Sequence, residues 1–437
     1  MFPVVKRWAA RNQFMPAILK LLILSALASA PTTLAAALTF DDALATAVRE
    51  APILRATTAR IAAAHHATLP AGELPDPKLI LGLDNVPVEG SDRFSTGSDF
   101  MTMQRIGLMQ EFTSTAKRQA RSEMASAREA LMRAEERESR QTVLRETALA
   151  WIARYTWEQQ LAQVAAWESD NLMFDRVVRA RLAAATGPVS ETLMPQEEAA
   201  VIATLRDQIW AGREQSLAQL RRWVGDAAER PLAGEVPHWT IDATDLNHKL
   251  HEHPELLSFN PRERLLEAGI AESRAATRPD WDVTVAWLER GSGFSDMAML
   301  EVRVDLPLFT GSRQTPMIAS KLADRAALDA ERDASLREHA AMLEVELSEY
   351  HRLLRLEQRY TNTLLPLADK KVDLAMASWR SAQGSLTEVI AARRDRIATR
   401  LQAIETTGQR QLIAAGLHFA YGNIDETDSA SLTGAQP

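Results

Sequence analysis

Two long stretches of the chain carry apolar residues at a helical period and lack helix-breaking residues. The first, 113–186, contains neither glycine nor proline and ends at Gly187 and Pro188; the second, 317–365, resumes after Pro366 and runs to position 383. Apolar positions that alternate spacings of three and four form the seam of a coiled coil. A helix through the first stretch would be roughly 110 Å long. The expected seam residues are Ala120, Met124, Ala127, Leu131 and Ala134 in the first stretch, beyond which the seam drifts, and Leu336, Ala340, Leu343, Leu347, Tyr350 and Leu354 in the second.

Ahead of each long stretch the apolar period changes to two, which is typical of β-strands. Strands are expected over 78–86 and 101–112, forming a β-hairpin within 78–112, and over 280–290 and 297–309, forming a second β-hairpin. These lengths are close to the 9–11 residues that a tilted strand needs to cross a bilayer. The alternative is a water-soluble sheet with one wet face.

The second half of the chain repeats the first. Phe112 and Phe309 are 197 positions apart, and so are Gly225 and Gly422, whereas Pro52 and Pro254 are 202 apart. Pro77 and Pro279 are also 202 positions apart, so the five-residue difference falls between the proline before the first strand and the phenylalanine that closes the second. That interval contains the strand–strand loop, where insertions are tolerated. We expect a duplicated helix–strand–strand–helix–helix unit. The expected division is a first repeat over 38–225 with a helical hairpin over 113–224, a linker over 226–245, and a second repeat over 246–422 with a helical hairpin over 312–421.

The two ends of the chain differ from the repeats in composition. Basic residues precede a short apolar run at 21–28, and small residues follow at 34–37, which predicts a signal peptide over 1–37. The small polar residues 423–437 are expected to form a disordered tail. The chain has no cysteine, which excludes disulfides, thiolate metal sites and an acylated N-terminal cysteine. Its net charge of −8 argues against nucleic acid as a partner.

Four strands of membrane-crossing length cannot close a barrel within one chain, because the smallest single-chain barrels have about eight strands. Open strand edges in lipid cost several kcal/mol for each unpaired backbone group. Copies of the chain must therefore share a barrel, with twelve strands in a trimer or eight in a dimer, and the spacing alone does not choose between them. We expect Leu79, Leu81, Leu83, Val283, Val285 and Trp287 to face lipid, and Asp282, Thr284, Glu301, Arg303 and Asp305 to line the lumen.

These features make the chain similar to the TolC-type outer-membrane efflux channels over essentially its whole mature length. The resemblance rests on residues 38–44 with Pro52, on the duplicated β-hairpin, and on the helix turns 185–191 and 382–388. It implies a mainly α fold with a small β part. Duplicated long α-helical hairpins would form a periplasmic tube, and four strands per chain would contribute to a trimeric twelve-stranded transmembrane β-barrel. Many members place tyrosine and glycine where this chain has Trp379 and Ala382.

The resemblance also implies location and partners. The protein is expected in the outer membrane of a Gram-negative cell envelope and in contact with its lipid, extending into the periplasm as a homotrimer that works with a periplasmic adaptor and an inner-membrane RND-type pump. Residues 74–87 and 110–112, with Lys117 and Arg118, resemble the heavy-metal branch, whose channels serve cobalt–zinc–cadmium and copper–silver exporters.

The turns of the helical hairpins are the expected docking tips. Gly187 and Gly384 are expected to supply the left-handed residue of each turn. A ring of Glu388 could gate the mouth for cations. The alternative is a plain first-turn carboxylate near a helix N-terminus, with Ser190 or Thr387 as the cap. The tip residues are Gly187, Ser190, Glu191, Gly384, Thr387 and Glu388.

Two sets of residues raise the question of metal binding. His248, His251 and His253 could coordinate a metal, but their spacing places only one pair on a shared helix face, so surface histidines are the favoured interpretation. Several methionines share one parity of the strands, and their thioethers would suit Cu(I) as ligands. A role in side-chain packing is the favoured interpretation of these methionines. No metal site and no cofactor are therefore predicted. The methionines of one strand parity are Met101, Met103, Met109, Met297 and Met299.

The sequence carries no nucleophile–base pair, phosphate-binding loop or catalytic metal motif, so we do not expect an enzyme. The predicted function is a passive exit duct of a tripartite efflux system that conducts heavy-metal cations. The alternatives are a periplasmic adaptor and a structural coiled-coil component of an efflux or secretion assembly.

Overall fold

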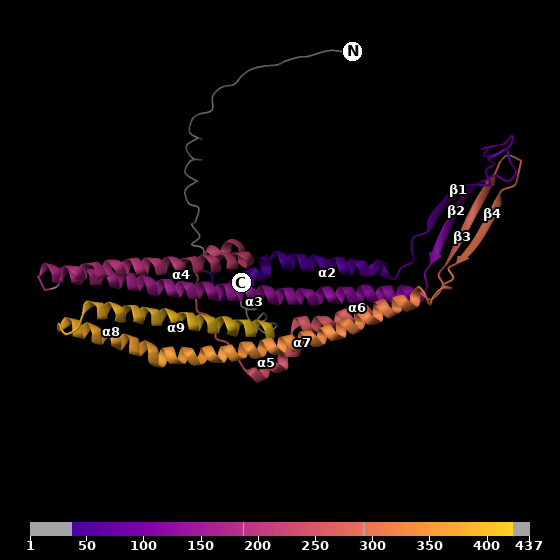
Figure 1. The fold of residues 1–437 in the computed structure, drawn as a ribbon. Helices are drawn as coiled ribbons and strands as arrows, with labels where there is room; N and C mark the ends of the chain where they lie inside the picture. Colours follow the sequence, from indigo (N-terminus) through magenta and orange to yellow (C-terminus); the bar gives the residue numbers. More distant parts are fainter. Residues whose placement is uncertain (1–36, 187, 292, 423–437) are drawn as a thin grey trace, which may run out of the picture.

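The protein is an elongated body of long helices with a small sheet projecting from one end (Figure 1). The computed structural model describes residues 37–186, 188–291 and 293–422. Apart from Ala37, the predicted signal peptide lies outside these residues, as does the predicted tail. The first half of the chain forms α1 (Phe40–Glu50), α2 (Pro52–Ala71), β1 (Lys78–Asp84), β2 (Met103–Phe112), α3 (Thr115–Ala183), the 3-10 turn η1 (Val189–Leu193) and α4 (Met194–Val224).

The second half repeats this order. It forms the 3-10 turn η2 (Gly225–Glu229), α5 (Ala243–Lys249), η3 (Leu250–Glu252), α6 (Pro254–Ala275), β3 (Trp281–Arg290), β4 (Met297–Val304), α7 (Gln314–Arg359), the π-helical turn η4 (Tyr360–Leu364), α8 (Leu365–Arg380) and α9 (Leu386–Tyr421). The predicted fold class, mainly helical with duplicated long helical hairpins and four strands, is confirmed for the chain.

Helix α3 is the longest element, with 69 residues, or about 100 Å at 1.5 Å per residue. The Ser114 hydroxyl caps its start by accepting a hydrogen bond from the Lys117 N–H at 3.4 Å. Its buried seam continues beyond the predicted part through Gln141, whose side-chain amide donates to the carbonyls of Phe419 and Ala420, each at 2.7 Å. The seam is therefore longer than its apolar residues indicate. Buried residues at heptad spacing include Ala120, Ala127, Leu131, Ala134, Gln141 and Ala148.

The equivalent helix of the second repeat is interrupted. The turn Tyr360–Leu364 is π-helical and ends two residues before Pro366. Proline lacks an N–H and clashes with the carbonyl four residues earlier, so a local widening of the helix is a common way to accommodate it. In the seam of α7, Leu343, Leu347 and Tyr350 are buried as predicted, whereas Ala340 is exposed.

The four strands form one antiparallel sheet in the order β1-β2-β3-β4. Val283 pairs with Val302, and Thr284 pairs with Glu301. Strand β2 starts at Met103 rather than at the predicted position 101, and β4 ends at Val304 rather than at position 309. The latter difference has a physical reason, since Pro307 offers no N–H for a strand ladder.

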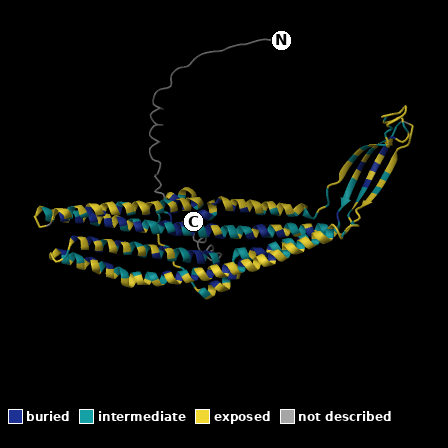
Figure 2. Cartoon of the chain, in the orientation of Figure 1, coloured by how far each residue is buried: buried dark blue, intermediate teal, exposed yellow. Residues whose placement is uncertain are grey.

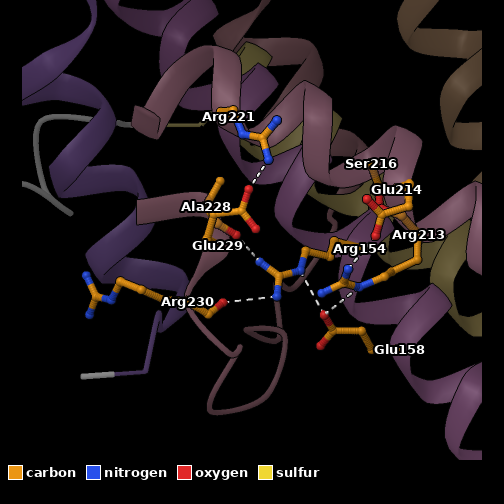
Figure 3. Close-up of polar contacts among 9 residues, drawn as sticks. All are labelled: Arg154, Glu158, Arg213, Glu214, Ser216, Arg221, Ala228, Glu229 and Arg230. Carbon is orange, nitrogen blue, oxygen red and sulfur yellow. Dashed lines mark hydrogen bonds and ion pairs between the residues drawn. The ribbon is translucent and has the colours of Figure 1, made fainter. Parts of the chain in front are cut away.

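The segment predicted as a linker packs tightly against α3 (Figure 3). The Arg154 side chain is 1% exposed, and its guanidinium donates to the carbonyls of Ala228 and Arg230 and, at 2.8 Å, to a Glu158 carboxylate oxygen. Leu232 forms a parallel bridge with Leu38. The connection between the repeats is therefore fixed to the helical body.

The core lies where α1, α3, α4, η2 and α9 meet. Trp151 is fully buried, and its ring packs edge-on against Phe40 at 5.5 Å between centroids. Away from this region the long helices keep large exposed areas (Figure 2). Within the described ranges, no helix has both the length and the apolar character required to cross a membrane.

Candidate functional site: the two faces of the sheet and the helical tips

The sheet has one apolar face and one polar face. Register places Leu81 opposite Ile106, Ile106 opposite Trp287, and Val285 opposite Leu300. All of these side chains are more than half exposed, which is unusual for a patch of this size on a soluble protein. The predicted lipid-facing residues therefore lie together. Exposed residues of this apolar face are Leu79, Leu81, Leu83, Ile106, Leu108, Val285, Trp287, Leu300, Val302 and Val304.

The opposite face carries the residues predicted to line the lumen. Arg303 lies between two acids, with Nε 3.3 Å from Asp282 Oδ1 and 3.4 Å from Glu301 Oε1. Thr284 is 1% exposed on the same face. Asp305 differs from the prediction, because it follows the last residue of β4; its N–H donates to the Asp280 carbonyl at 2.8 Å. The polar face of the strands therefore contains Asp282, Thr284, Glu301 and Arg303, without Asp305.

A partly buried ion pair joins the sheet to α3. Lys117 Nζ lies 2.5 Å from Asp280 Oδ2, and Oδ1 of the same carboxylate accepts the Ser114 N–H at 2.9 Å. The rings of Phe112 and Trp281 stack nearby with centroids 4.3 Å apart. Asp280 therefore fixes the start of α3 to the strand that follows α6.

The helix turns at the far end of the body differ from the prediction. The left-handed residues are Ala185 and Ala382, with φ of 55° and 61°, and Gly384 does not have positive φ. Each alanine closes a helix, since the N–H of the next residue returns to the carbonyl five positions earlier: Thr186 to Arg181 and Gln383 to Ser378, each at 2.9 Å. Gly187 lies outside the described residues.

Gly384 serves close packing. A Cβ at this position would lie 2.6 Å from Ser378 Oγ and 3.1 Å from Glu388 Oε2. The glycine therefore leaves room for the carboxylate of Glu388, a residue predicted to act at the mouth.

Glu388 takes part in a capping box at the start of α9. The Ser385 hydroxyl accepts the Glu388 N–H at 3.2 Å, and Glu388 Oε2 accepts the Ser385 N–H at 3.1 Å. The N-cap is therefore Ser385, and the expectation that Thr387 would cap this helix is wrong. The spacing Ser-x-x-Glu was the sequence signal for this arrangement. At the first tip, Pro188 precedes η1, and Ser190 lies within that turn rather than capping it.

Below the tips, the helices of both repeats pack together. The rings of Phe174 on α3 and Trp379 on α8 lie 5.7 Å apart, and the Arg181 guanidinium lies 4.3 Å from the Trp379 ring centroid. Glu198 on α4 pairs with Arg394 on α9. Burial raises the pKa of Glu198, although Arg394 opposes this shift. The tips of the two helical hairpins are therefore connected.

The candidate metal ligands separate into two groups. Met103, Met109, Met297 and Met299 lie on the polar face in register, whereas Met101 precedes β2.

His248 and His251 are exposed, as expected of surface histidines. His253 is not a surface residue: it is half-buried and meets Glu255 and His339. Sequence spacing missed this cluster because His339 belongs to α7, far along the chain.

No family model and no curated protein matches the chain. Solved structures do match it. A membrane protein from Pseudomonas aeruginosa has a TM-score of 0.75 at 17% identity, with 88% of this chain and 90% of that chain covered. The outer membrane protein VceC from Vibrio cholerae has a TM-score of 0.72 at 16% identity, covering 88% and 96%. The open-state MtrE outer membrane channel of Neisseria gonorrhoeae has a TM-score of 0.70 at 14% identity, covering 88% and 89%. The chain shares the fold of these membrane proteins, two of which are outer-membrane proteins.

Proposed function

We propose that the protein is an outer-membrane exit duct in which three copies share one twelve-stranded barrel, continued by a helical tube in the periplasm. The observation that carries the proposal is the sheet: one face is apolar and exposed, the other is polar, and both edge strands lack a second neighbour among the described residues. Such edges require partners in lipid. The likeness in fold to outer-membrane channels supports the same conclusion.

The duct is passive, and its energy comes from an RND-type inner-membrane pump, reached through a periplasmic adaptor that docks at the helical tips. The exposed tip surface around Ser190, Glu191, Thr387 and Glu388 is the proposed docking site. An adaptor role for this chain is less suitable, because an adaptor would combine one helical hairpin with soluble β-domains, whereas this chain has two such hairpins and a sheet with an exposed apolar face.

Heavy-metal cations are the proposed substrates. Support comes from the resemblance of residues 74–87 and 110–112 to channels of metal exporters, and from the acids Asp282 and Glu301 on the polar face of the sheet. Three copies of Glu388 would add negative charge at the mouth, where acidic rings favour cations.

Fractionation and susceptibility together test the proposal. We expect the mature protein in the outer membrane as a detergent-stable trimer. A strain lacking it should become sensitive to zinc, cobalt, cadmium, copper or silver salts, and the intact gene should restore resistance. A water-soluble monomer would refute the duct. An outer-membrane trimer whose loss sensitises cells only to hydrophobic drugs would refute the metal substrate and leave the duct intact.

A further inference from the structure

Two histidines and a glutamate converge in the helical body, away from the tips and the sheet. His253 precedes α6, Glu255 lies in its first turn, and His339 lies on α7. One nitrogen from each imidazole and one carboxylate oxygen all lie within 4.8 Å of one another. His339 Nε2 is 3.0 Å from Glu255 Oε2, and the two imidazole rings are 4.1 Å apart between centroids.

Burial and hydrogen bonds shift the pKa of His253 and the pKa of Glu255. Burial, and next the neighbouring His339, lowers the pKa of His253 to about 4, so this imidazole is neutral near pH 7. Burial alone would raise the pKa of Glu255, but hydrogen bonds from His339 and Ser335 outweigh it and hold that pKa below its ordinary value.

The cluster is also incompletely satisfied by protein atoms. Nδ1 of His253 is buried and has no hydrogen-bond partner within the described part of the chain. A buried polar atom without a partner typically costs about 1–3 kcal/mol. His253 is therefore not explained as an ordinary core histidine held by hydrogen bonds.

An outer shell of polar groups holds two of the three side chains. Ser335 Oγ donates to Glu255 Oε1 at 3.0 Å, and the Tyr421 hydroxyl lies 3.5 Å from Nδ1 of His339. Burial raises the pKa of Tyr421 to about 12, so its hydroxyl remains protonated and serves as a hydrogen-bonding partner. Such partners orient metal-binding histidines and carboxylates.

Charges of both signs and an open cavity surround the cluster. Glu138 and Glu346 approach it, and so does Arg145. A cavity of about 310 Å³ reaches His253 and Tyr421 from outside. Its lining also includes Glu252, Arg137, Arg140 and Lys249.

We propose that His253, Glu255 and His339 bind one divalent transition-metal ion of the zinc type, with water as a fourth ligand. Two imidazoles and one carboxylate form a common three-residue zinc set. Nε2 of His339, which lies 3.0 Å from Glu255 Oε2, would face the ion, and Nδ1, which lies 3.5 Å from the Tyr421 hydroxyl, would hold the ring proton. The ion links the start of α6 to α7. It is a resident ion rather than cargo, and the site is independent of the proposed duct.

Titration of the full mature chain in detergent, purified without a histidine tag, tests the site. We expect one Zn²⁺ per chain by calorimetry, and Co²⁺ should give visible absorption bands from nitrogen and oxygen ligands. Loss of an outer-shell partner weakens metal binding about 10–100-fold, so Tyr421→Phe should weaken Zn²⁺ binding about 10-fold. His339→Ala and His253→Ala each remove a ligand and should weaken Zn²⁺ binding about 100-fold or more.

His251→Ala is the matched control, because His251 is exposed two residues from His253 and should leave binding unchanged. Glu255→Gln keeps the size of the side chain and removes its charge, so it should weaken binding even if an alanine variant fails to fold. Zn²⁺ should raise the melting temperature of the wild type and of His251→Ala more than that of Tyr421→Phe, Glu255→Gln or His339→Ala. Equal Zn²⁺ affinity in the wild type, Glu255→Gln and His339→Ala would overturn the proposal.

Discussion

At the scale of single residues, a few buried polar side chains determine how distant segments meet. Arg154 is the clearest case, because one guanidinium serves an ion pair with Glu158 and two backbone carbonyls of the segment between the repeats. Gln141 similarly joins α3 to the end of α9. Neither role could be predicted, because a polar residue on a helix is ordinarily assigned to the solvent side.

Arg154→Met should lower the free energy of unfolding by about 3 kcal/mol, since the carbonyls of Ala228 and Arg230 lose their donor and Glu158 loses its nearest cation. Urea unfolding of the detergent-solubilised protein, followed by far-UV circular dichroism, measures this. Arg355→Met, at an exposed position of α7, should change the value by less than about 0.5 kcal/mol. Equal effects from both variants would show that the contacts of Arg154 contribute nothing to the free energy of unfolding.

Ala382→Gly should raise the free energy of unfolding by about 1 kcal/mol, because alanine is strained at a left-handed φ that glycine adopts freely. Ala377→Gly is the control: it is an exposed position within α8, where glycine should instead destabilise by about 1 kcal/mol. The same sign of change in both variants would contradict the assigned backbone conformation.

At the scale of elements, the sequence predicted the order of helices and strands, because apolar periodicity and proline positions report local structure directly. The ends of the strands and the conformation of the turns were harder to predict from the sequence. Pro307 ended β4 early. Ala185 and Ala382 are left-handed because helix-closing hydrogen bonds set these positions, and at the second turn the left-handed residue is Ala382 rather than the predicted Gly384. The cluster of His253 with His339 could not be predicted, since it depends on packing between helices.

The capping box at α9 allows the structural role of Glu388 to be separated from a role in conduction. Ser385→Ala should destabilise the tip by about 1 kcal/mol through loss of the cap, whereas Thr387→Ala should have little effect. Glu388→Gln keeps the capping geometry and removes the charge. Stability should therefore persist in Glu388→Gln while cation selectivity in planar bilayers falls; unchanged selectivity would exclude Glu388 as a gate.

At the scale of the whole molecule, the two faces of the sheet predict opposite responses to charge. Leu81→Arg places a cation on the exposed apolar face, where arginine costs roughly 2–4 kcal/mol at the middle of a bilayer. Ile80→Arg, one residue earlier, places the same charge on the polar face. We expect Leu81→Arg to reduce the outer-membrane trimer in membrane fractions and Ile80→Arg to leave it nearly intact. Equal yields would contradict the assignment of the lipid face.

The open edges at β1 and β4 also determine which mutant alleles should be dominant. If the ring closes head to tail, the β1 edge of each copy pairs with the β4 edge of the next. A copy with a blocked edge strand would then prevent closure of any ring that includes it. With equal amounts of normal and blocked copies, about one three-member ring in eight would contain only normal copies. Alleles that damage either border strand should accordingly act dominantly, whereas alleles that merely unfold the chain should be recessive.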